Sequence, residues 1–570
     1  MSEGTHFEIL AMGRGSWQVQ AVLDREDSAI QQAHDMHRLD KGGVLKVVKV
    51  EFHSRSGEFR EREICKVGKV KAGEGRYSEG LDAGPACTEL SELLSLTGRR
   101  AIKRVLRSWL DSIGVTPFEL LHHPDYLNRL ENSGTMLQSA VQRAAMAQSN
   151  ATGGSLHDRQ RELFRLVDEA IAKARKLWRD DSRPRFDGID LPAFIESLGD
   201  SDDISYFFNA SIADWLSSFK TPGEKLQSLV TLAEQAKGSA ERARIDDCLT
   251  DFLEDAQAVT QMLGDRASLG DALMHIASLV GGEPDGDDDG DEEFAVLKQL
   301  IRGGELPKCR QTLLRRIVSS LEGQRSLSDH GVVADARIAA ELRRCLCSED
   351  GQVVGGSEME AAFERRSEKF VSPDAIGRVL DGIVAPDKRV KILLDVEEGV
   401  MGRVNKRRFG EYVVAVLRVP DNIEQLSAPQ GPAAVYMREL AGIQKRILQS
   451  GLTEKQKEEG AEILDRICVT IMKSERILEK VGERSPGPVA TAVALLRLCA
   501  AGTFTEGAAS DTVRERIVSV LKTPTFLNGY LSGAEGNNER RQRLYELQEL
   551  FEKAQVPETP LTAAVAMALR

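Results

Sequence analysis

Residues Thr312–Leu321 read TLLRRIVSSL, and residues Thr512–Leu521 read TVRERIVSVL. Six of the ten aligned positions are identical in these two segments. Apolar residues recur every three or four positions in both, which is typical of one face of an α-helix. This ten-residue repeat predicts that the chain contains copies of one helical module, and that these copies stack on one another.

A second repeat, called here the proline–glycine repeat, links residues 222–249 with residues 386–413. Five residues of the first segment (Pro222, Leu229, Glu234, Gly238 and Arg244) return in the second as Pro386, Leu393, Glu398, Gly402 and Arg408. Proline suits the first turn of a helix, and glycine is expected where a helix ends. We therefore expect a helix that begins at each proline and ends near each glycine, followed by a helix that carries the arginine.

The composition predicts a soluble globular protein of about three to five domains. The chain has 570 residues, of which 41% are hydrophobic and 29% are charged. Its formal net charge is −13, which argues against a dedicated nucleic-acid-binding protein, because contacts to phosphate groups need a basic surface. Eight cysteines occur without a C-x-x-C motif, and this pattern favours buried free thiols over a zinc site.

The first 67 residues differ in pattern from the rest of the chain. Phe7–Met12, Trp17–Ala21, Val44–Phe52 and Phe59–Val67 have the residue types of strands, with a helix expected after Asp24 or Asp27. Turns are expected at Gly13–Gly15 and Ser54–Gly57. From Thr88 onward the periodicity is helical.

We expect a mainly α fold, in which a helical bundle or an irregular helical-repeat array follows a small N-terminal α/β domain of order ββαββ. The expected parts are a small α/β domain (1–67), a flexible linker (68–87), helical region 1 (88–282), an acidic loop (283–293), helical region 2 (294–427), and helical region 3 (428–570), which partly repeats region 2.

The acidic loop resembles the opening of a calcium-binding loop. Asp285, Asp287 and Asp289 stand at alternate positions and are followed by Gly290. Val296 occupies the twelfth position, where such a loop needs a bidentate glutamate. We therefore interpret the segment as a solvated acidic loop and expect no metal site, with a divalent-ion site at these aspartates as the alternative. We also expect no cofactor.

Two basic clusters are candidates for binding a partner. The first contains Arg99, Arg100, Lys103, Arg104 and Arg107, and the second contains Lys406 and Arg407. Each suits an acidic protein surface or a phosphate-bearing ligand. The alternative is a solvated helix face that nearby acidic residues balance.

These patterns favour a non-enzymatic cytoplasmic scaffold or regulatory adaptor that binds a protein partner through helical surfaces. No nucleophile motif, phosphate-binding loop or dinucleotide fingerprint is present, so no catalytic residue is assigned. The alternative is a small-ligand sensor that uses the N-terminal domain or an inter-helical pocket, and a third hypothesis is an unrecognised enzyme. The sequence contains neither a secretory signal nor an apolar stretch long enough to span a membrane, which predicts a cytoplasmic location.

Overall fold

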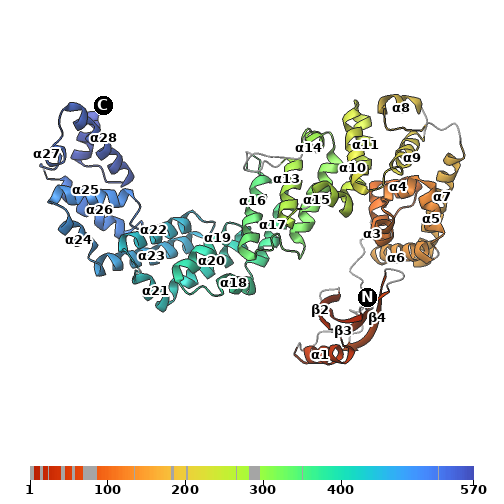
Figure 1. The fold of residues 1–570 in the computed structure, drawn as a ribbon, viewed down its shortest axis with the longest axis horizontal. Coiled ribbons are helices and arrows are strands. Elements are labelled where there is room, and N and C mark those ends of the chain that lie inside the picture. The colour runs from red at the N-terminus through yellow and green to blue at the C-terminus, as the bar shows by residue number, and fades with distance from the viewer. Residues whose placement is uncertain are drawn as a thin grey trace. The chain divides into compact units, whose positions relative to one another are not determined.

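The computed structural model describes residues 5–12, 17–23, 25–39, 45–53, 58–67, 86–133, 135–180, 185–199, 203–264, 266–281, 295–348, 351–429, 431–523 and 525–569. The fold is mainly helical, as predicted (Figure 1). The chain forms two compact units, Met1–Lys237 (unit 1) and Gly238–Arg570 (unit 2). The expected turns at 13–15 and 54–57, nearly all of the expected linker and the whole acidic loop lie outside the described residues.

The beginning of unit 1 forms a four-stranded antiparallel sheet and one helix. The elements are β1 (Thr5–Met12), β2 (Trp17–Leu23), α1 (Glu26–Leu39), β3 (Leu45–His53) and β4 (Glu58–Val67), and the strand order is β2-β1-β3-β4. Ile9 of β1 pairs with Val47 of β3, and both side chains are fully buried. Ala29 and Ala33 of α1 pack against them because residues four apart share one helix face. That this segment is an independent domain stays a prediction.

The rest of unit 1 is helical. Its helices are α2 (Leu90–Leu94), α3 (Leu96–Ile113), α4 (Pro117–His122), α5 (Pro124–Glu131), α6 (Thr135–Thr152), α7 (Leu156–Trp178), α8 (Leu191–Ser197), α9 (Ile204–Leu216) and α10 (Pro222–Gln235). Proline at the first position and a reciprocal pair of hydrogen bonds between Thr116 and Glu119 fix the start of α4. Lys225 of α10 donates to the buried Glu119 carboxylate over 2.6 Å, which ties α10 to α4.

Unit 2 consists of stacked helix pairs. Its helices up to the middle are α11 (Ser239–Glu254), α12 (Ala256–Leu263), α13 (Leu269–Val280), α14 (Ala295–Arg302), α15 (Pro307–Glu322), α16 (Val332–Cys345), α17 (Gly356–Phe370), α18 (Pro373–Leu380), α19 (Pro386–Glu397) and α20 (Arg403–Arg418). The remainder are α21 (Pro420–Ser427), α22 (Ala433–Gln449), α23 (Glu454–Ser474), α24 (Ile477–Arg484), α25 (Pro488–Ala500), α26 (Ala508–Leu521), α27 (Phe526–Leu531), α28 (Asn537–Lys553) and α29 (Pro560–Leu569).

The pairs α13/α15, α16/α17, α19/α20, α22/α23 and α25/α26 follow one another along unit 2 (Figure 1). The second helices, together with α11, form one continuous row, in which α11, α15, α17, α20, α23 and α26 each pack on the next. The first helices α13, α16, α19 and α22 form a parallel row. Each pair buries its apolar faces against its neighbours, as in a repeat array.

The two copies of the ten-residue repeat occupy equivalent places in this stack. They lie in α15 and α26, each the second helix of its pair and each packed on the preceding helix of its row. The fully buried side chains fall at matching positions, with Ile317 and Leu321 in α15 and Ile517 and Leu521 in α26. The repeat therefore marks the face that each helix buries.

The starts of α15 and α26 are also held in the same way. The buried Asp246 of α11 accepts hydrogen bonds from the backbone N–H groups of Lys308 and Cys309, both at 2.9 Å. Asp465 of α23 accepts from Ala508 and Ala509 at 2.7 and 3.1 Å. The first N–H groups of a helix have no partner within the helix, so a carboxylate from the neighbouring helix satisfies them and favours the positive end of the helix dipole.

The proline–glycine repeat corresponds to two helix–turn–helix segments with matching bounds. Pro222 and Pro386 occupy the first turns of α10 and α19, as predicted. Gly238 and Gly402 lie in the break before the helix that carries the arginine, as predicted, but they cap the starts of α11 and α20 and not the ends of the preceding helices. Gly402 has φ = +87°, a conformation in which a side chain is strained.

Candidate functional site

The first predicted basic cluster lies on α3, and its first member belongs to the core. Arg99 is 1% exposed, donates to the Leu94 carbonyl over 3.0 Å and lies 5.7 Å from the centre of the Phe118 ring. Arg100 and Lys103 are partly buried. Arg104 and Arg107 are exposed. This helix therefore offers two exposed basic side chains, and that of Arg107 lies 3.8 Å from the Asp111 carboxylate.

The second predicted cluster lies on α20, and its two members also differ in exposure. The Lys406 ammonium group binds the buried Glu397 carboxylate and donates to the Glu397 carbonyl over 2.6 Å. Glu397 accepts a further hydrogen bond from the Gly451 N–H group. Lys406 therefore joins α20 to α19 within one pair, and Glu397 in turn contacts the turn between α22 and α23 of the next pair. Arg407 is exposed.

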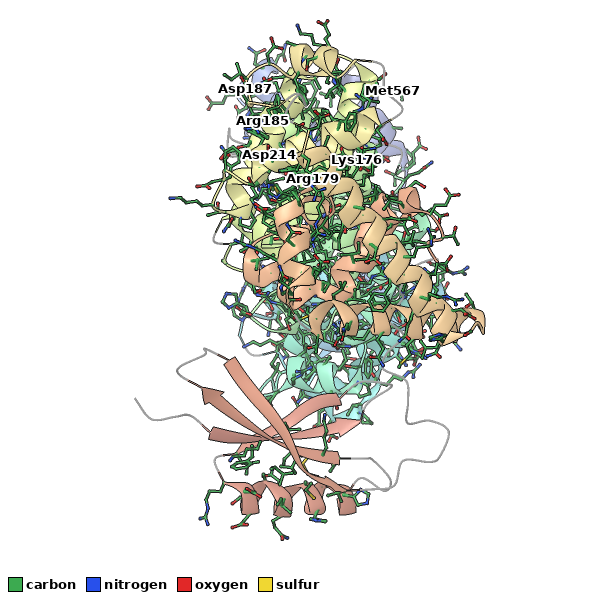
Figure 2. All side chains as sticks on the ribbon, turned by 90° about the vertical axis from the view of Figure 1, so that its right-hand side faces the viewer. Lys176, Arg179, Arg185, Asp187, Asp214 and Met567 are labelled. Atoms are coloured by element: carbon green, nitrogen blue, oxygen red, sulfur yellow. The ribbon has the colours of Figure 1, made fainter. Side chains whose placement is uncertain are left out.

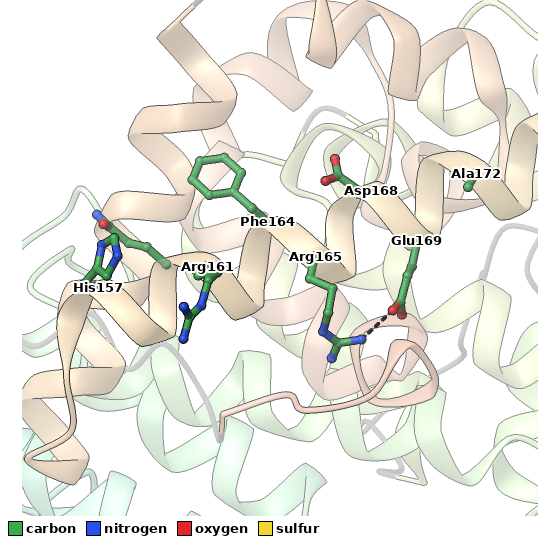
Figure 3. Close-up of a pocket in the computed structure, with 8 residues that line it drawn as sticks. His157, Arg161, Phe164, Arg165, Asp168, Glu169 and Ala172 are labelled. Atoms are coloured by element: carbon green, nitrogen blue, oxygen red, sulfur yellow. Dashed lines mark hydrogen bonds and ion pairs between the residues drawn. The ribbon is translucent and has the colours of Figure 1, made fainter.

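A large surface hollow follows one face of α7 (Figure 3). Its volume is about 710 Å³, and its lining residues, among them His157, Phe164 and Asp168, all come from α7. Arg165 binds Glu169 and also donates to the Thr88 carbonyl over 2.8 Å. Because one helix supplies all the lining groups, they do not converge on a ligand from different sides.

The end of α7 presents a surface of mixed charge. Figure 2 labels Lys176, Arg179 and Arg185 on the face of unit 1 turned toward the viewer, together with Asp187 and Asp214. The Asp214 carboxylate lies 3.6 Å from the Nε2 atom of His123. The acidic and basic groups offset each other there, so this surface does not select one sign of charge.

A groove in unit 2 brings together side chains from α22, α26 and α28. Its volume is about 510 Å³, and we call it the α22–α26–α28 groove. One face of α22 forms a wall with Arg438, Ala441, Gly442, Lys445, Leu448 and Gln449. The segment from Cys499 to Glu506, the first half of α26 and the end of α28 complete the lining. Several separate elements therefore face one space, as in most ligand-binding sites.

Gln444 and Arg514 fix the shape of this groove. The amide group of Gln444 accepts from the Glu506 N–H group at 2.7 Å and donates to the Glu506 carbonyl at 2.8 Å. Arg514 donates to the Ala554 carbonyl at 3.3 Å and to the Gln555 side chain at 3.0 Å, which joins α26 to the end of α28.

Gln555 itself has φ = +50°, a left-handed conformation that costs a residue with a side chain about 1 kcal/mol or more. The groove thus contains a strained residue that Arg514 holds in place.

The charge in the groove is mainly positive. Four basic side chains line it (Arg438, Lys445, Arg514 and Lys553), against one acidic side chain, that of Glu506. Arg514 lies 3.4 Å from the Asp511 carboxylate, and Lys553 lies 2.6 Å from that of Glu549. Arg438 and Lys445 form no ion pair with any described residue, so they supply the free positive charge of the groove.

Gly442 lies in the middle of the α22 wall, between Arg438 and Lys445. A Cβ atom at this position would meet nothing within 4 Å, so the packing of unit 2 does not require glycine. Glycine inside a helix is less favourable than alanine by about 1 kcal/mol. A bare backbone in a groove wall allows a bound chain to approach closely.

The chemistry of the groove fits binding better than covalent catalysis. Burial raises the pKa of the Cys499 thiol to about 11, while the positive charge of Arg514 opposes this effect. The thiol is therefore protonated at neutral pH and is a poor nucleophile. Among the described residues, no group of three or more histidine, cysteine, aspartate or glutamate side chains is arranged to hold a metal ion.

Comparisons with known protein families, with functionally characterised proteins and with solved structures found no match to this chain. Within the described part of the chain, no helix has the length and apolar character needed to cross a membrane. The candidate site therefore rests on the geometry of the groove. Sequence reasoning missed Arg438 and Lys445 because they are seven residues apart in an ordinary amphipathic helix and form no basic cluster. Arg514, in contrast, lies within the ten-residue repeat.

Proposed function

We propose that this chain is a non-enzymatic scaffold or adaptor that binds an acidic segment of a partner protein in the α22–α26–α28 groove. The observation that carries the proposal is the pair of basic residues Arg438 and Lys445, which form no ion pair with any described residue. They lie on one wall of the groove, and Arg514 holds the wall opposite. The N-terminal sheet and helix, as a separate α/β domain, serve as a second contact point. We also propose a cytoplasmic location and a regulatory role.

The spacing of the two free charges favours an extended partner segment. Arg438 and Lys445 stand two helical turns apart, a rise of roughly 10 Å along α22. Side chains three residues apart in a polyproline II segment are separated by about 9 Å on the same side. Acidic residues with this spacing reach both charges, while the partner backbone passes Gly442.

The groove is a better candidate than the exposed residues of α3. Arg107 has a nearby acidic residue in Asp111, whereas Arg438 and Lys445 form no ion pair with a described residue and face α26 and α28 across the groove. The Asp111 carboxylate offsets the charge of Arg107 and competes with an acidic partner for it. The α3 residues therefore provide a matched control.

The test is fluorescence anisotropy with labelled proline-rich peptides that carry glutamate at every third position. We expect binding by the full chain, at least a tenfold loss of affinity (about 1.4 kcal/mol) in the double variant Arg438→Glu/Lys445→Glu, and weaker binding at high salt. The variant Arg104→Glu/Arg107→Glu carries the same change in charge and should retain binding. Equal losses in both variants, or no binding by the unmodified chain, would contradict the proposal.

A second candidate function is a small-ligand sensor that uses an inter-helical pocket. An apolar cavity inside unit 1, lined by residues of several helices, favours it. Its ligand chemistry differs from that of the groove, so the two functions are separable by experiment.

A further inference from the structure

Unit 1 contains an apolar cavity of about 90 Å³ among its helices. Leucines from each of the helices α2 to α7 contribute to its wall, among them Leu106 of α3, Leu130 of α5 and Leu163 of α7. Small side chains, Ala140 and Ala144 of α6, lie beside them. This cavity is separate from the groove of unit 2 and shares no residue with it.

The wall of the cavity offers almost no partner for water. Gln148 is a polar residue in the lining, and its side-chain oxygen already accepts from Arg159 Nε over 2.5 Å. An ordered water molecule needs two to four polar partners, so this lining favours an apolar ligand over ordered water.

Three clusters of buried side chains surround the cavity. Leu106 and Leu130 belong to one cluster of buried side chains, Leu121 and Leu166 to another, and Val141 and Leu163 to a third. Protein interiors are close-packed, and the buried side chains of one bundle usually form a single contiguous core. All three clusters contribute lining residues, and so do Ile102, Leu137 and Ala144, each of which packs against two clusters, so the cavity lies where the clusters join.

We propose that this cavity is a binding site for a small apolar molecule or the end of a hydrocarbon chain, a proposal that rests on the second candidate function and is independent of the groove. A cavity of 150 Å³ binds benzene, so a volume of 90 Å³ accommodates about four carbon atoms or one xenon atom. Affinity comes from filling empty space beside the leucine side chains, and no charged or hydrogen-bonding group of the ligand is required. Filling the cavity stabilises the helices of unit 1, which links ligand binding to their order.

The experiment uses the full chain with ¹³C-labelled leucine methyl groups, and xenon as the probe. We expect xenon to shift the methyl signals of Leu106, Leu130 and Leu163, whereas Leu464 and Leu495 of unit 2 serve as internal controls. Shifts of equal size in both units would indicate only non-specific dissolution of xenon in protein interiors. Absence of a shift at the lining leucines would equally overturn the proposal.

Two variants locate the response in the cavity. Ala140→Leu fills the space and should abolish the xenon shifts at the lining leucines; their persistence would overturn the proposal. Should that variant fail to fold, Leu130→Ala enlarges the same space. Benzene should then shift the remaining lining methyl groups in this variant, and an unchanged spectrum would count against the site.

Discussion

Helices α15 and α26 share a framework and differ in what they present to their surroundings. Both bury isoleucine and leucine at matching positions, and an aspartate of the preceding row helix holds the start of each. At the third position of the ten-residue repeat, however, α15 has Leu314 and α26 has Arg514. Leu314 lies near the α16–α17 turn at Gly355, whereas Arg514 lines the α22–α26–α28 groove. Identical residues therefore mark packing, and a difference between the copies marks the candidate site.

The substitutions with the largest expected effect test whether the buried faces of α15 and α26 contribute equally to stability. Ile317→Ala and Ile517→Ala should each destabilise their own helix by about 2–5 kcal/mol, because each removes a fully buried side chain. Hydrogen exchange of the α15 and α26 amide groups measures the local free energy of opening. A clear loss at one position and almost none at the other would break the equivalence.

The aspartate contacts give the next largest effect. Asp246→Ala and Asp465→Ala should each cost about 2–4 kcal/mol, because each leaves two backbone N–H groups without a charged acceptor. Asparagine retains one side-chain oxygen, so Asp246→Asn and Asp465→Asn should recover part of the loss. Urea unfolding, with amide exchange to locate the change, distinguishes these variants. Equal stability of the alanine and asparagine variants would show that the hydrogen bonds are not the cause.

Arg514→Leu gives α26 the residue that α15 has at the same position. We expect about a tenfold weaker affinity for the acidic peptides, because the variant removes a positive charge and the contact that holds Gln555. Arg516→Leu removes an exposed arginine of the same helix and should leave peptide affinity unchanged. Anisotropy titrations of both variants provide the measurement. Similar losses in the two would indicate a general effect of charge.

Gly442→Ala separates the stability of the groove from its function and has the smallest expected effect. The added methyl group meets no other atom and favours the helix, so unfolding should require up to about 1 kcal/mol more free energy. Peptide binding should weaken, because the methyl group occupies the space along the wall. Thermal unfolding and anisotropy check the two effects, and a variant that gains stability without losing affinity would argue against close approach of a partner backbone.

Local patterns predicted much of the secondary structure. The strand-type segments before residue 68 correspond to β1–β4, and the prolines at 222 and 386 begin helices. These predictions succeed because proline geometry and apolar periodicity act within a few residues. The breaks at Gly238 and Gly402 were predicted correctly. Their role at a helix end was wrong, because a glycine in a short turn suits the end of one helix and the start of the next equally well.

The predicted basic clusters show where sequence reasoning stops. The sequence pattern predicted that Arg99 and Lys406 lie on a charged surface. Arg99 instead lies in the core, and Lys406 binds the buried Glu397. Whether an arginine or a lysine is free depends on acceptors supplied by other helices. Arg438 and Lys445 lack such acceptors among the described residues, and nothing in their own helix distinguishes them.

The sequence by itself determined that the chain is mainly helical and that α15 and α26 bury the same face, because the period of apolar residues sets which side of a helix avoids water. Tertiary structure alone decided that Asp246 and Asp465 meet the starts of α15 and α26, and that α22, α26 and α28 enclose a basic groove. The physical reason is the distance along the chain over which each effect acts. Periodicity acts within one helix, whereas a hydrogen bond or an unpaired charge depends on atoms that only the packing of distant helices brings together.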